Sequence, residues 1–490
     1  QQPMALLFVA LAALIGVIVG ALPGLTAPTA IALLMPVTFY LEPLVALAFL
    51  YVIGKSGRFG GSISAILFNT PGTAASAATM LDGNPLTRQG KSGKALKMAA
   101  LASVFGDTTG ELLLIFGASA IATLTATFGP PEFFSIYLMA FVIIGSVVGK
   151  SIVKGLLSTL FGALVSLVGM DPISAEPRLT MGLLELESGF SLVPLLIGIF
   201  VMSEIMYNAE ETLSGHVRKF IMVDSKDRDS NRVTWAEFKR CLPVMIRSSV
   251  LGSLIGIIPG LGSPVACFVA YSEEKRRAPN KEAWGTGVLE GVAAPESANN
   301  AVSGPSMIPL LTLGVPGSTI AAILIGVFLI HGIQVGPTIF ETAHDLVFGL
   351  FACGLIGIAL YGLIGYFGGP LIGRLVALLS PRIIYPFIFL TAFIAAYSAR
   401  SSVSDVVIML IFGIIGYIMR KFDFAPAAFI IAFVLAKGAE ESYRQSLLLS
   451  DAGNGIFLDR PIALGFMALG LFVVIWRSVA TLRAGLNPSG

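Results

Sequence analysis

Long apolar segments recur along the whole of this 490-residue chain, and they decide what it can fold into. An α-helix needs about 20 mostly apolar residues to cross the hydrocarbon core of a bilayer. The candidate spans are residues 4–22, 27–54, 98–127, 133–149, 151–169, 190–208, 242–258, 346–367, 383–397, 405–419, 424–437 and 461–478. Charged residues make up only 12% of the chain, too few to cover soluble domains of this total length. The sequence therefore predicts an all-α polytopic membrane protein with about 10–12 spanning segments.

The composition also excludes several classes of protein. A net charge of +2 gives no electrostatic basis for binding nucleic acid. The three cysteines and three histidines are scattered, without the spacing of a disulfide framework or a metal site. No GxxxxGK[ST] phosphate-binding loop occurs. We therefore expect no catalytic residues, no ATP-driven step and no bound cofactor.

Clusters of lysine and arginine in loops mark the cytoplasmic side of a membrane protein. Basic clusters lie at 88–97, at Lys150 and Lys154, in the polar loop 210–240 and at 275–281. The intervening loops are poor in basic residues. From residue 88 to 240 the alternation is regular, but Arg400 and Arg444 fall where it assigns the exterior. No cleavable signal peptide is apparent.

The chain contains an internal repeat in which two Pro-Gly motifs recur in the same order. Residues 16–28 follow the pattern Gly-x3-Gly-x2-Pro-Gly-Leu-Thr-Ala-Pro, and residues 252–264 follow Gly-x3-Gly-x2-Pro-Gly-Leu-Gly-Ser-Pro. In the second pair, Asn69-Thr70-Pro71-Gly72-Thr73 matches Gly314-Val315-Pro316-Gly317-Ser318. Each member of the second pair interrupts an apolar segment, at 57–82 and 305–330. The two patterns at 16–28 and 252–264 each begin with two glycines in GxxxG spacing, and we expect these glycines to allow close packing of helices.

The charges that follow the second pair indicate that the two halves are inserted in opposite senses. The segment 83–97 is basic, hence cytoplasmic, whereas 331–345 is acidic, hence external. Inverted-topology repeats with broken helices at matching positions are typical of secondary transporters. We predict a first repeat at 1–209, a cytoplasmic linker at 210–240, a second repeat at 241–460 and a C-terminal helix and tail at 461–490. The counterpart of the amphipathic stretch 234–247 would precede Gln1, so we expect an N-terminal segment to be missing.

The Pro-Gly breaks are the candidate substrate site. A helix that restarts in mid-membrane presents unpaired N–H groups with partial positive charge, which can bind a carboxylate without a buried basic residue. Hydroxyls and an amide beside the breaks add further donors. The predicted substrate-binding residues are Asn69, Thr70, Pro71, Gly72, Thr73, Gly314, Val315, Pro316, Gly317, Ser318 and Thr319 at the two hairpin tips, with Pro23, Gly24, Thr26, Gly260, Gly262 and Ser263 closing the site.

Ionisable residues inside apolar segments are functional candidates by default. Glu296, with Asn299 and Asn300, forms the densest polar cluster beside a broken helix and could hold a sodium ion or a proton; a polar loop end is the alternative. Lys55 and Arg58 occupy the corresponding place in the first half, where they could attract an anion or extend to an interface. Asp107 and Glu111, one helical turn apart, could relay protons or face other helices.

Three other classes of function are alternatives to a transporter. A channel would need a continuous polar or charged ring along a pore. An intramembrane enzyme would need a nucleophile and base, or metal ligands, inside a span. A purely structural subunit would not need matched broken hairpins. The sequence favours a secondary transporter, and fold analogy suggests a movement of the elevator type.

These motifs together resemble the large membrane subunit of the tripartite tricarboxylate transporter family. The likeness rests on the Pro-Gly motifs, on Asp82-Gly83-Asn84-Pro85, on residues 295–301 and on His331-Gly332-Ile333-Gln334-Val335-Gly336-Pro337. Lys55 and Arg58 depart from it, since the resemblance leads us to expect small or aromatic residues there.

The resemblance implies a multi-pass permease of the bacterial inner membrane. It would act with a small membrane subunit of about four helices and a periplasmic solute-binding protein that delivers the substrate. Its substrates would be carboxylates such as citrate or other di- and tricarboxylates, and a gradient of Na⁺ or H⁺ would drive their uptake.

Overall fold

The computed structural model describes residues 2–22, 24–147, 151–171, 174–213, 231–379, 381–450 and 453–486. Helices account for nearly all regular structure, and β1 (Gly169–Met170) and β2 (Pro177–Arg178) form a small antiparallel pair. The prediction of an all-α protein is confirmed.

The first half of the chain contains two long helices that flank a broken one. Its helical elements are α1 (Gln2–Ala21), α2 (Ala27–Leu34), η1 (Met35–Tyr40), α3 (Pro43–Phe68), α4 (Ser76–Arg88), α5 (Ser92–Thr125), α6 (Pro130–Val147), α7 (Ile152–Ser166), η2 (Leu184–Leu186), α8 (Leu192–Leu196), the π-helical η3 (Ile197–Met202) and α9 (Ser203–Leu213).

The second half has the same sequence of long, broken and long helices. Its elements are α10 (Trp235–Ile257), α11 (Gly262–Arg277), α12 (Leu289–Ala301), η5 (Pro305–Met307), α13 (Ile308–Leu313), α14 (Thr319–Ile330), α15 (Ile339–Thr342), α16 (His344–Leu378), α17 (Pro381–Arg400), α18 (Val403–Lys421), α19 (Pro426–Leu448), η6 (Gly453–Gly455), α20 (Ile456–Asp459) and α21 (Pro461–Leu486). A capping box between Thr234 and Glu237 starts α10, so this helix begins inside the predicted linker 210–240, most of which lies outside the described residues.

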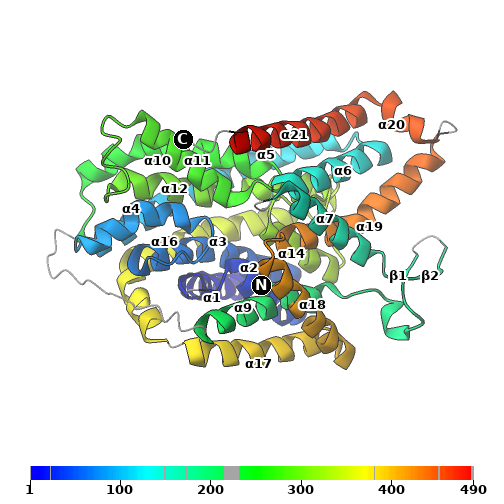
Figure 1. The fold of residues 1–490 in the computed structure, drawn as a ribbon, viewed down its shortest axis with the longest axis horizontal. Helices are drawn as coiled ribbons and strands as arrows, with labels where there is room; N and C mark the ends of the chain where they lie inside the picture. The colour runs from blue at the N-terminus through cyan, green and yellow to red at the C-terminus, as the bar shows by residue number, and fades with distance from the viewer. Residues whose placement is uncertain are drawn as a thin grey trace.

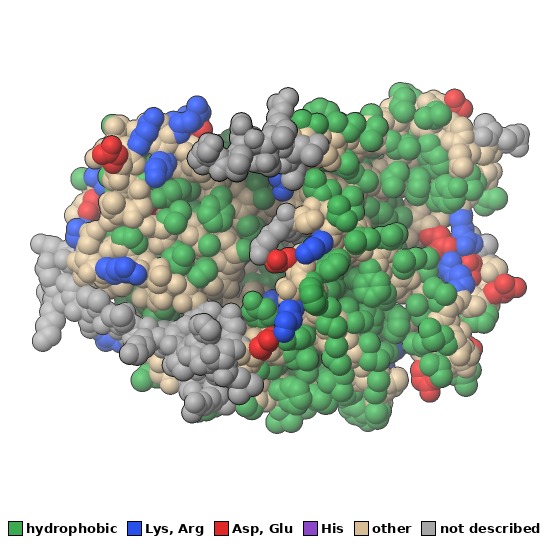
Figure 2. Space-filling model, in the orientation of Figure 1, with side chains coloured by type: hydrophobic (Ala, Val, Ile, Leu, Met, Phe, Trp, Pro, Cys, Tyr) green, Lys and Arg blue, Asp and Glu red, His purple; other side chains and the backbone are tan. Residues whose placement is uncertain are grey.

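The membrane character of the chain is clear from its surface and its helix lengths. Nine helices among the described residues are long and apolar enough to cross a membrane, and three shorter apolar helices accompany them. Figure 2 shows hydrophobic side chains over much of one face, with charged side chains at both ends of the molecule and a few near its middle. Large exposed apolar residues on the outer helices are Phe116, Phe367, Phe387, Leu390, Phe472 and Trp476. This is a multi-pass membrane protein.

One predicted span is wrong in its bounds. Residues 27–54 form α2, η1 and the first part of α3, because the chain is extended at Glu42 and a new helix begins at Pro43. Proline at the first helical position has its φ fixed for the helix and no N–H to leave unpaired. α3 then continues to Phe68, through the first part of the interrupted segment 57–82.

The two halves exchange partners at the centre of the molecule. Helix α1 packs on α3 and α10 packs on α12, each within its own half, whereas α5 packs on α12 and α16 packs on α3, across the halves (Figure 1). The outer helices repeat the correspondence, with α7 against α19 and α18 against η3 and α9.

Glycine makes the central contacts close, as the GxxxG spacing predicts. A Cβ on Gly20 of α1 would lie 2.3 Å from the carbonyl oxygen of Gly57, and one on Gly252 of α10 would lie 2.4 Å from that of Ala298. The contact between halves is similar, since a Cβ on Gly106 of α5 would lie 2.1 Å from the carbonyl oxygen of Ser297.

Many of the charged residues form ion pairs, and two groups of these pairs bear on the orientation of the chain. At one end, Lys94 pairs with Glu237 at 2.7 Å and Arg240 with Glu290 at 2.5 Å, and Gln89 Nε2 donates to the carbonyl oxygen of Thr286 at 2.7 Å. The basic stretches near 90, 240 and 280 therefore share one end. Towards the β1–β2 pair, Arg444 pairs with Asp171 at 2.8 Å and with Glu440 at 2.5 Å. Arg400 likewise pairs with Asp405. The two arginines that disturbed the alternation are thus held by carboxylates.

Candidate functional site

The first predicted tip, Asn69–Thr73, is a true break between two helices. Asn69 ends α3 in the left-handed conformation, with φ of 53°. Thr73 and Ser76 then start α4 by reciprocal bonds: the Thr73 N–H donates to Ser76 Oγ at 3.0 Å, and the Ser76 N–H donates to Thr73 Oγ1 at 3.2 Å. Asn69 and Pro71 are exposed, and Thr70 and Thr73 are half-buried.

The second tip, Gly314–Thr319, repeats this geometry. Gly314 ends α13 with φ of 69°, and Ser318 Oγ caps α14 by accepting from the Ala321 N–H at 3.2 Å. The glycines correspond as well, since the Gly72 N–H donates to Gly61 O and the Gly317 N–H donates to Ser306 O, both at 3.3 Å. Val315, Pro316 and Gly317 are buried. The Thr73 O–H donates to Ser76 Oγ at 3.3 Å, and Ser318 Oγ lies 3.3 Å from Ser306 Oγ. Both are long side-chain hydrogen bonds, which a carboxylate ligand could replace.

The tips meet α3 rather than each other. Among the described residues no hydrogen bond joins Asn69–Thr73 to Gly314–Thr319. A Cβ on Gly61 would lie 3.0 Å from Cγ2 of Thr73, and a Cβ on Gly54 would lie 3.0 Å from Cγ2 of Ile320, which follows Thr319. Gly54 and Gly61 are two turns apart on α3, or about 10 Å along its axis.

Of the two earlier Pro-Gly turns, the second contacts a tip, and the first packs against Asn208 of α9. Gly260, with φ of 86°, donates its N–H to Gly317 O at 3.4 Å, and Gly262 also has positive φ. In the first turn, Thr26 caps α2 and Gly24 has φ of 85°, while Pro23 lies outside the described residues.

Glu296 lies inside α12 and is completely buried, so the alternative of a polar loop end is wrong. Ser62 Oγ and Thr79 Oγ1 each donate to its Oε1 at 2.5 Å, and Ser103 Oγ donates to its Oε2 at 2.9 Å. These hydroxyls come from α3, α4 and α5. None of the lysine, arginine or histidine nitrogens that the structure describes pairs with this carboxylate.

Other buried carboxylates are compensated differently. Asp82 accepts from three backbone N–H groups at 2.8–2.9 Å and from Tyr271, and Glu274 pairs with Arg247 at 2.5 Å. The two asparagines beside Glu296 are also unusual. Both side-chain polar atoms of Asn299, and Oδ1 of Asn300, are buried without a hydrogen-bond partner among the described residues.

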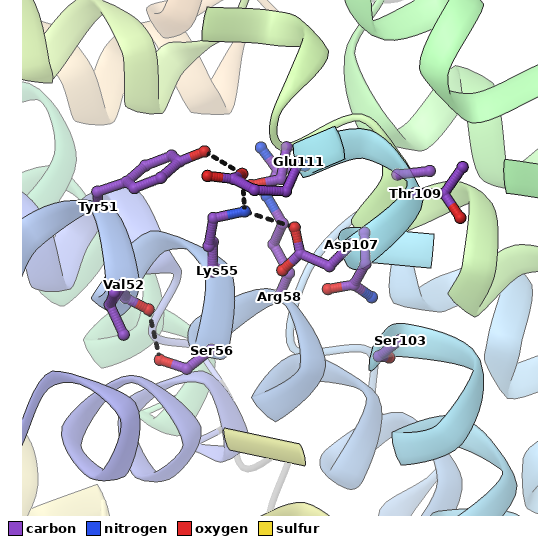
Figure 3. A network of polar contacts seen from close by, with 12 residues as sticks. Tyr51, Val52, Lys55, Ser56, Arg58, Ser103, Asp107, Thr109 and Glu111 are labelled. Carbon is purple, nitrogen blue, oxygen red and sulfur yellow. Dashed lines mark hydrogen bonds and ion pairs between the residues drawn. The ribbon is translucent and has the colours of Figure 1, made fainter. Parts of the chain in front are cut away.

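A second buried network surrounds Lys55 (Figure 3). Its Nζ lies 2.6 Å from Asp107 Oδ1 and 2.8 Å from Glu111 Oε2, and all three side chains are completely buried. The Tyr51 hydroxyl donates to Glu111 at 2.7 Å, and the Tyr361 hydroxyl donates to Asp107 Oδ2 at 3.0 Å. Asp107 and Glu111 therefore face α3, and Lys55 neither extends to an interface nor is free to bind an anion.

Arg58, one turn after Lys55, is only 8% exposed. Its Nη1 donates to Ser263 Oγ, in the second Pro-Gly turn, and to the carbonyl oxygen of Asn299 at 3.1 Å. Arg58 thus joins the first half of the chain to two predicted site residues of the second half.

Sequence reasoning missed the hydroxyls of Ser62, Thr79 and Ser103 as partners of Glu296. The residues are separated from Glu296 by about 190 to 230 positions, and serine and threonine are common on apolar helices, where they bond to the preceding turn. Their spacing therefore carries no signal of the cluster.

Comparison with known proteins identifies the relatives of this chain. The profile of the tripartite tricarboxylate transporter TctA family matches residues 6–431. An uncharacterized 52.8 kDa protein in the TAR-I ttuC' 3' region of Agrobacterium vitis is 35% identical over 96% of this chain and 92% of its own length. An uncharacterized protein in the TAR-II ttuC' 3' region of the same organism is 37% identical over 48% of this chain and 96% of its own length.

No solved structure matches the chain. The family match spans both broken helices, the Glu296 cluster and the Lys55 network, so it covers the whole candidate site. This chain belongs to the tripartite tricarboxylate transporter TctA family.

Proposed function

We propose that the chain is a secondary permease of the bacterial inner membrane that takes up di- or tricarboxylates delivered by a periplasmic binding protein. A gradient of Na⁺ or H⁺ drives the uptake, and a small membrane subunit completes the complex. The observation that carries the proposal is the pair of matched helix breaks, each with a left-handed C-terminus and a hydroxyl-capped restart, in an apolar chain.

The substrate carboxylates bind at the N-termini of α4 and α14. Restarted helices concentrate partial positive charge there, and Thr73 and Ser318 add O–H donors. α5 packs on α12 of the second half, and α16 packs on α3 of the first half. This reciprocal packing supports an inverted two-fold relationship, because such symmetry would place the long helix of each half against the broken helix of the other.

The coupling cation binds at Glu296. Its carboxylate and the oxygens of Ser62, Thr79 and Ser103 are hard ligands that suit Na⁺, and the same carboxylate could take a proton. The described residues of this interior cluster include two cations, Lys55 and Arg58, and three acids, Asp107, Glu111 and Glu296. A bound cation would remove the excess negative charge before an anion enters.

Uptake into proteoliposomes tests the proposal. The full complex, with its binding protein, is supplied with labelled citrate, succinate or an aromatic carboxylate, with a gradient of Na⁺, of H⁺ or of neither. We expect accumulation of a di- or tricarboxylate only with one cation gradient. Equilibration without accumulation would indicate a channel, and an absence of any flux would indicate a structural subunit.

The double variant Thr73→Ala and Ser318→Ala tests the tips. We expect uptake to fall at least tenfold, since each loss of a helix cap costs about 1 kcal/mol and also removes a donor. The single variant Thr127→Ala, an exposed hydroxyl outside the site, is the control. Full uptake by the double variant would contradict the assignment of the tips.

A further inference from the structure

Arg58 lies between the points at which the two hairpin tips touch α3. Gly54 packs against Ile320, next to the second tip, and Gly61 packs against Thr73 in the first. Positions 54, 58 and 61 follow the i, i+4, i+7 spacing of one helix face. Arg58 is therefore about one turn, or roughly 5 Å, along α3 from each contact.

The guanidinium of Arg58 is held in place by hydrogen bonds at one nitrogen only. Ser263 and the Asn299 carbonyl both engage Nη1, while Nε and Nη2 make no hydrogen bond to a described residue. These two nitrogens keep some accessible surface, whereas the side-chain amide of Asn299 is completely buried. None of the carboxylates in the described ranges lies within ion-pair distance of Arg58.

Lys55 provides a contrast on the same helix. Its ammonium is matched by two carboxylates and lies 4.7 Å from the centre of the Tyr51 ring. The two oxygens of Asp107 accept from Lys55 and from the Tyr361 hydroxyl, and no hydrogen bond or ion pair joins Asp107 to Arg58. Figure 3 shows the contact between Lys55 and Asp107, with Arg58 nearby. Of these two interior cations, Arg58 is the one whose hydrogen-bonding capacity is unused.

A buried arginine without a carboxylate partner is costly, and the free edge of a guanidinium fits a carboxylate with two parallel N–H···O bonds. We propose that Arg58 binds one carboxylate of the substrate while the helix N-termini at the tips bind another, so that Arg58 selects acids with two or more carboxylates. This inference rests on the proposed function. Because Lys55 and Arg58 depart from the small or aromatic residues expected there, this selectivity would distinguish the chain within its family.

Binding of succinate and of its monoamide, succinamate, to the purified chain in nanodiscs with Na⁺ tests the inference. The wild type is expected to bind succinate better than succinamate. Arg58→Gln is expected to weaken succinate binding about 30-fold, equivalent to ~2 kcal/mol, and to abolish the preference. Glutamine still offers N–H groups to Ser263 and Asn299, so thermal stability without ligand is expected to be retained.

Each result decides the inference. Equal weakening of both ligands, or unchanged binding, would overturn the role of Arg58 while leaving the proposed function intact. A wild type that binds neither succinate nor citrate would overturn both proposals. Should Arg58→Gln fail to fold, Arg58→Lys is measured by the same ratio. It keeps the charge but not the planar pair of N–H groups, so it is expected to bind succinate more weakly and to show a smaller preference for it. A preference for succinate as large as that of the wild type would overturn the inference.

Discussion

At the scale of single residues, hydroxyl groups surround Glu296, which among the described residues is the one buried acid without a charged or backbone partner. Glu296 receives three side-chain O–H donors and lies next to asparagine amides that lack partners. Hydroxyls can either donate to a carboxylate or coordinate a cation through their lone pairs. The same hydroxyls can therefore stabilise the Glu296 carboxylate both with a bound cation and without one.

Glu296→Gln is expected to separate transport from its driving force. Glutamine keeps the shape but not the charge, so the variant resembles a permanently neutralised carboxylate. We expect gradient-driven uptake to fall at least tenfold, while exchange of labelled for unlabelled substrate across the membrane continues. Glu132→Gln removes another buried carboxylate, paired with Arg460 at 3.3 Å, and serves as the matched control. Normal gradient-driven uptake by Glu296→Gln would exclude Glu296 as the coupling site.

Lys55→Met is expected to destabilise the fold rather than to change ligand selectivity. Removing the ammonium leaves Asp107 and Glu111 buried side by side, and breaking a buried ion pair in this way costs about 3–5 kcal/mol. Thermal unfolding in detergent measures this loss. The triple variant Lys55→Met, Asp107→Asn and Glu111→Gln removes the uncompensated charges and should recover much of the stability. No recovery would show that packing of Lys55, not charge balance, is what matters.

At the scale of elements, each hairpin tip depends on a glycine that allows two backbones to meet. A Cβ on Gly72 would lie 2.7 Å from Gly20 O and 2.8 Å from Gly61 Cα, and a Cβ on Gly317 would lie 2.6 Å from Ser306 O. These neighbours are backbone atoms, so they cannot move aside as a flexible side chain would. The tips are held by packing as well as by caps.

Gly72→Ala and Gly317→Ala are therefore expected to destabilise the protein by about 1–3 kcal/mol each and to reduce uptake. Gly465→Ala in α21 is the control, because a Cβ there would meet no atom within 4 Å. Thermal unfolding and uptake are measured on all three. A Gly72→Ala protein as stable and active as Gly465→Ala would mean that the tip packs differently from the structure.

Hydropathy and proline-glycine patterns could predict the helices and both breaks, but not every boundary. The 27–54 span failed because the helix is interrupted at Leu41, Glu42 and Pro43, where one charged residue stands in a segment that is otherwise mostly apolar. Proline at a first helical position was the available signal. The ion network of Lys55 could not be predicted, because it depends on how α5 is rotated against α3. A single sequence does not specify the rotation of one helix against another.

At the scale of the whole molecule, the distribution of charge defines two ends. Basic residues near 90, 240 and 280 cluster at one end, and the acidic residues that hold Arg400 and Arg444 lie away from it. Exposed apolar side chains occupy the region between. The basic end is predicted to face the cytoplasm.

Cysteine labelling with a membrane-impermeant reagent tests this orientation. The native cysteines, Cys241, Cys267 and Cys353, are buried, so background labelling should be low. We expect Glu282→Cys to react only in inside-out vesicles and Glu176→Cys to react only from the outside of intact cells; both positions are exposed. The reverse pattern would overturn the predicted orientation, and labelling of both from one side would overturn the assignment of the two ends.

The exchange of long helices between the halves bears on how the protein is made. The hydroxyls that surround Glu296 belong to α3, α4 and α5, so all of them leave the ribosome long before Glu296, which follows Ser103 by 193 residues. Lys55, Asp107 and Glu111 are likewise neutralised within the first half. During biosynthesis the hydroxyls are thus already in the membrane when Glu296 enters it, so they can bond to the carboxylate without its first being exposed to lipid.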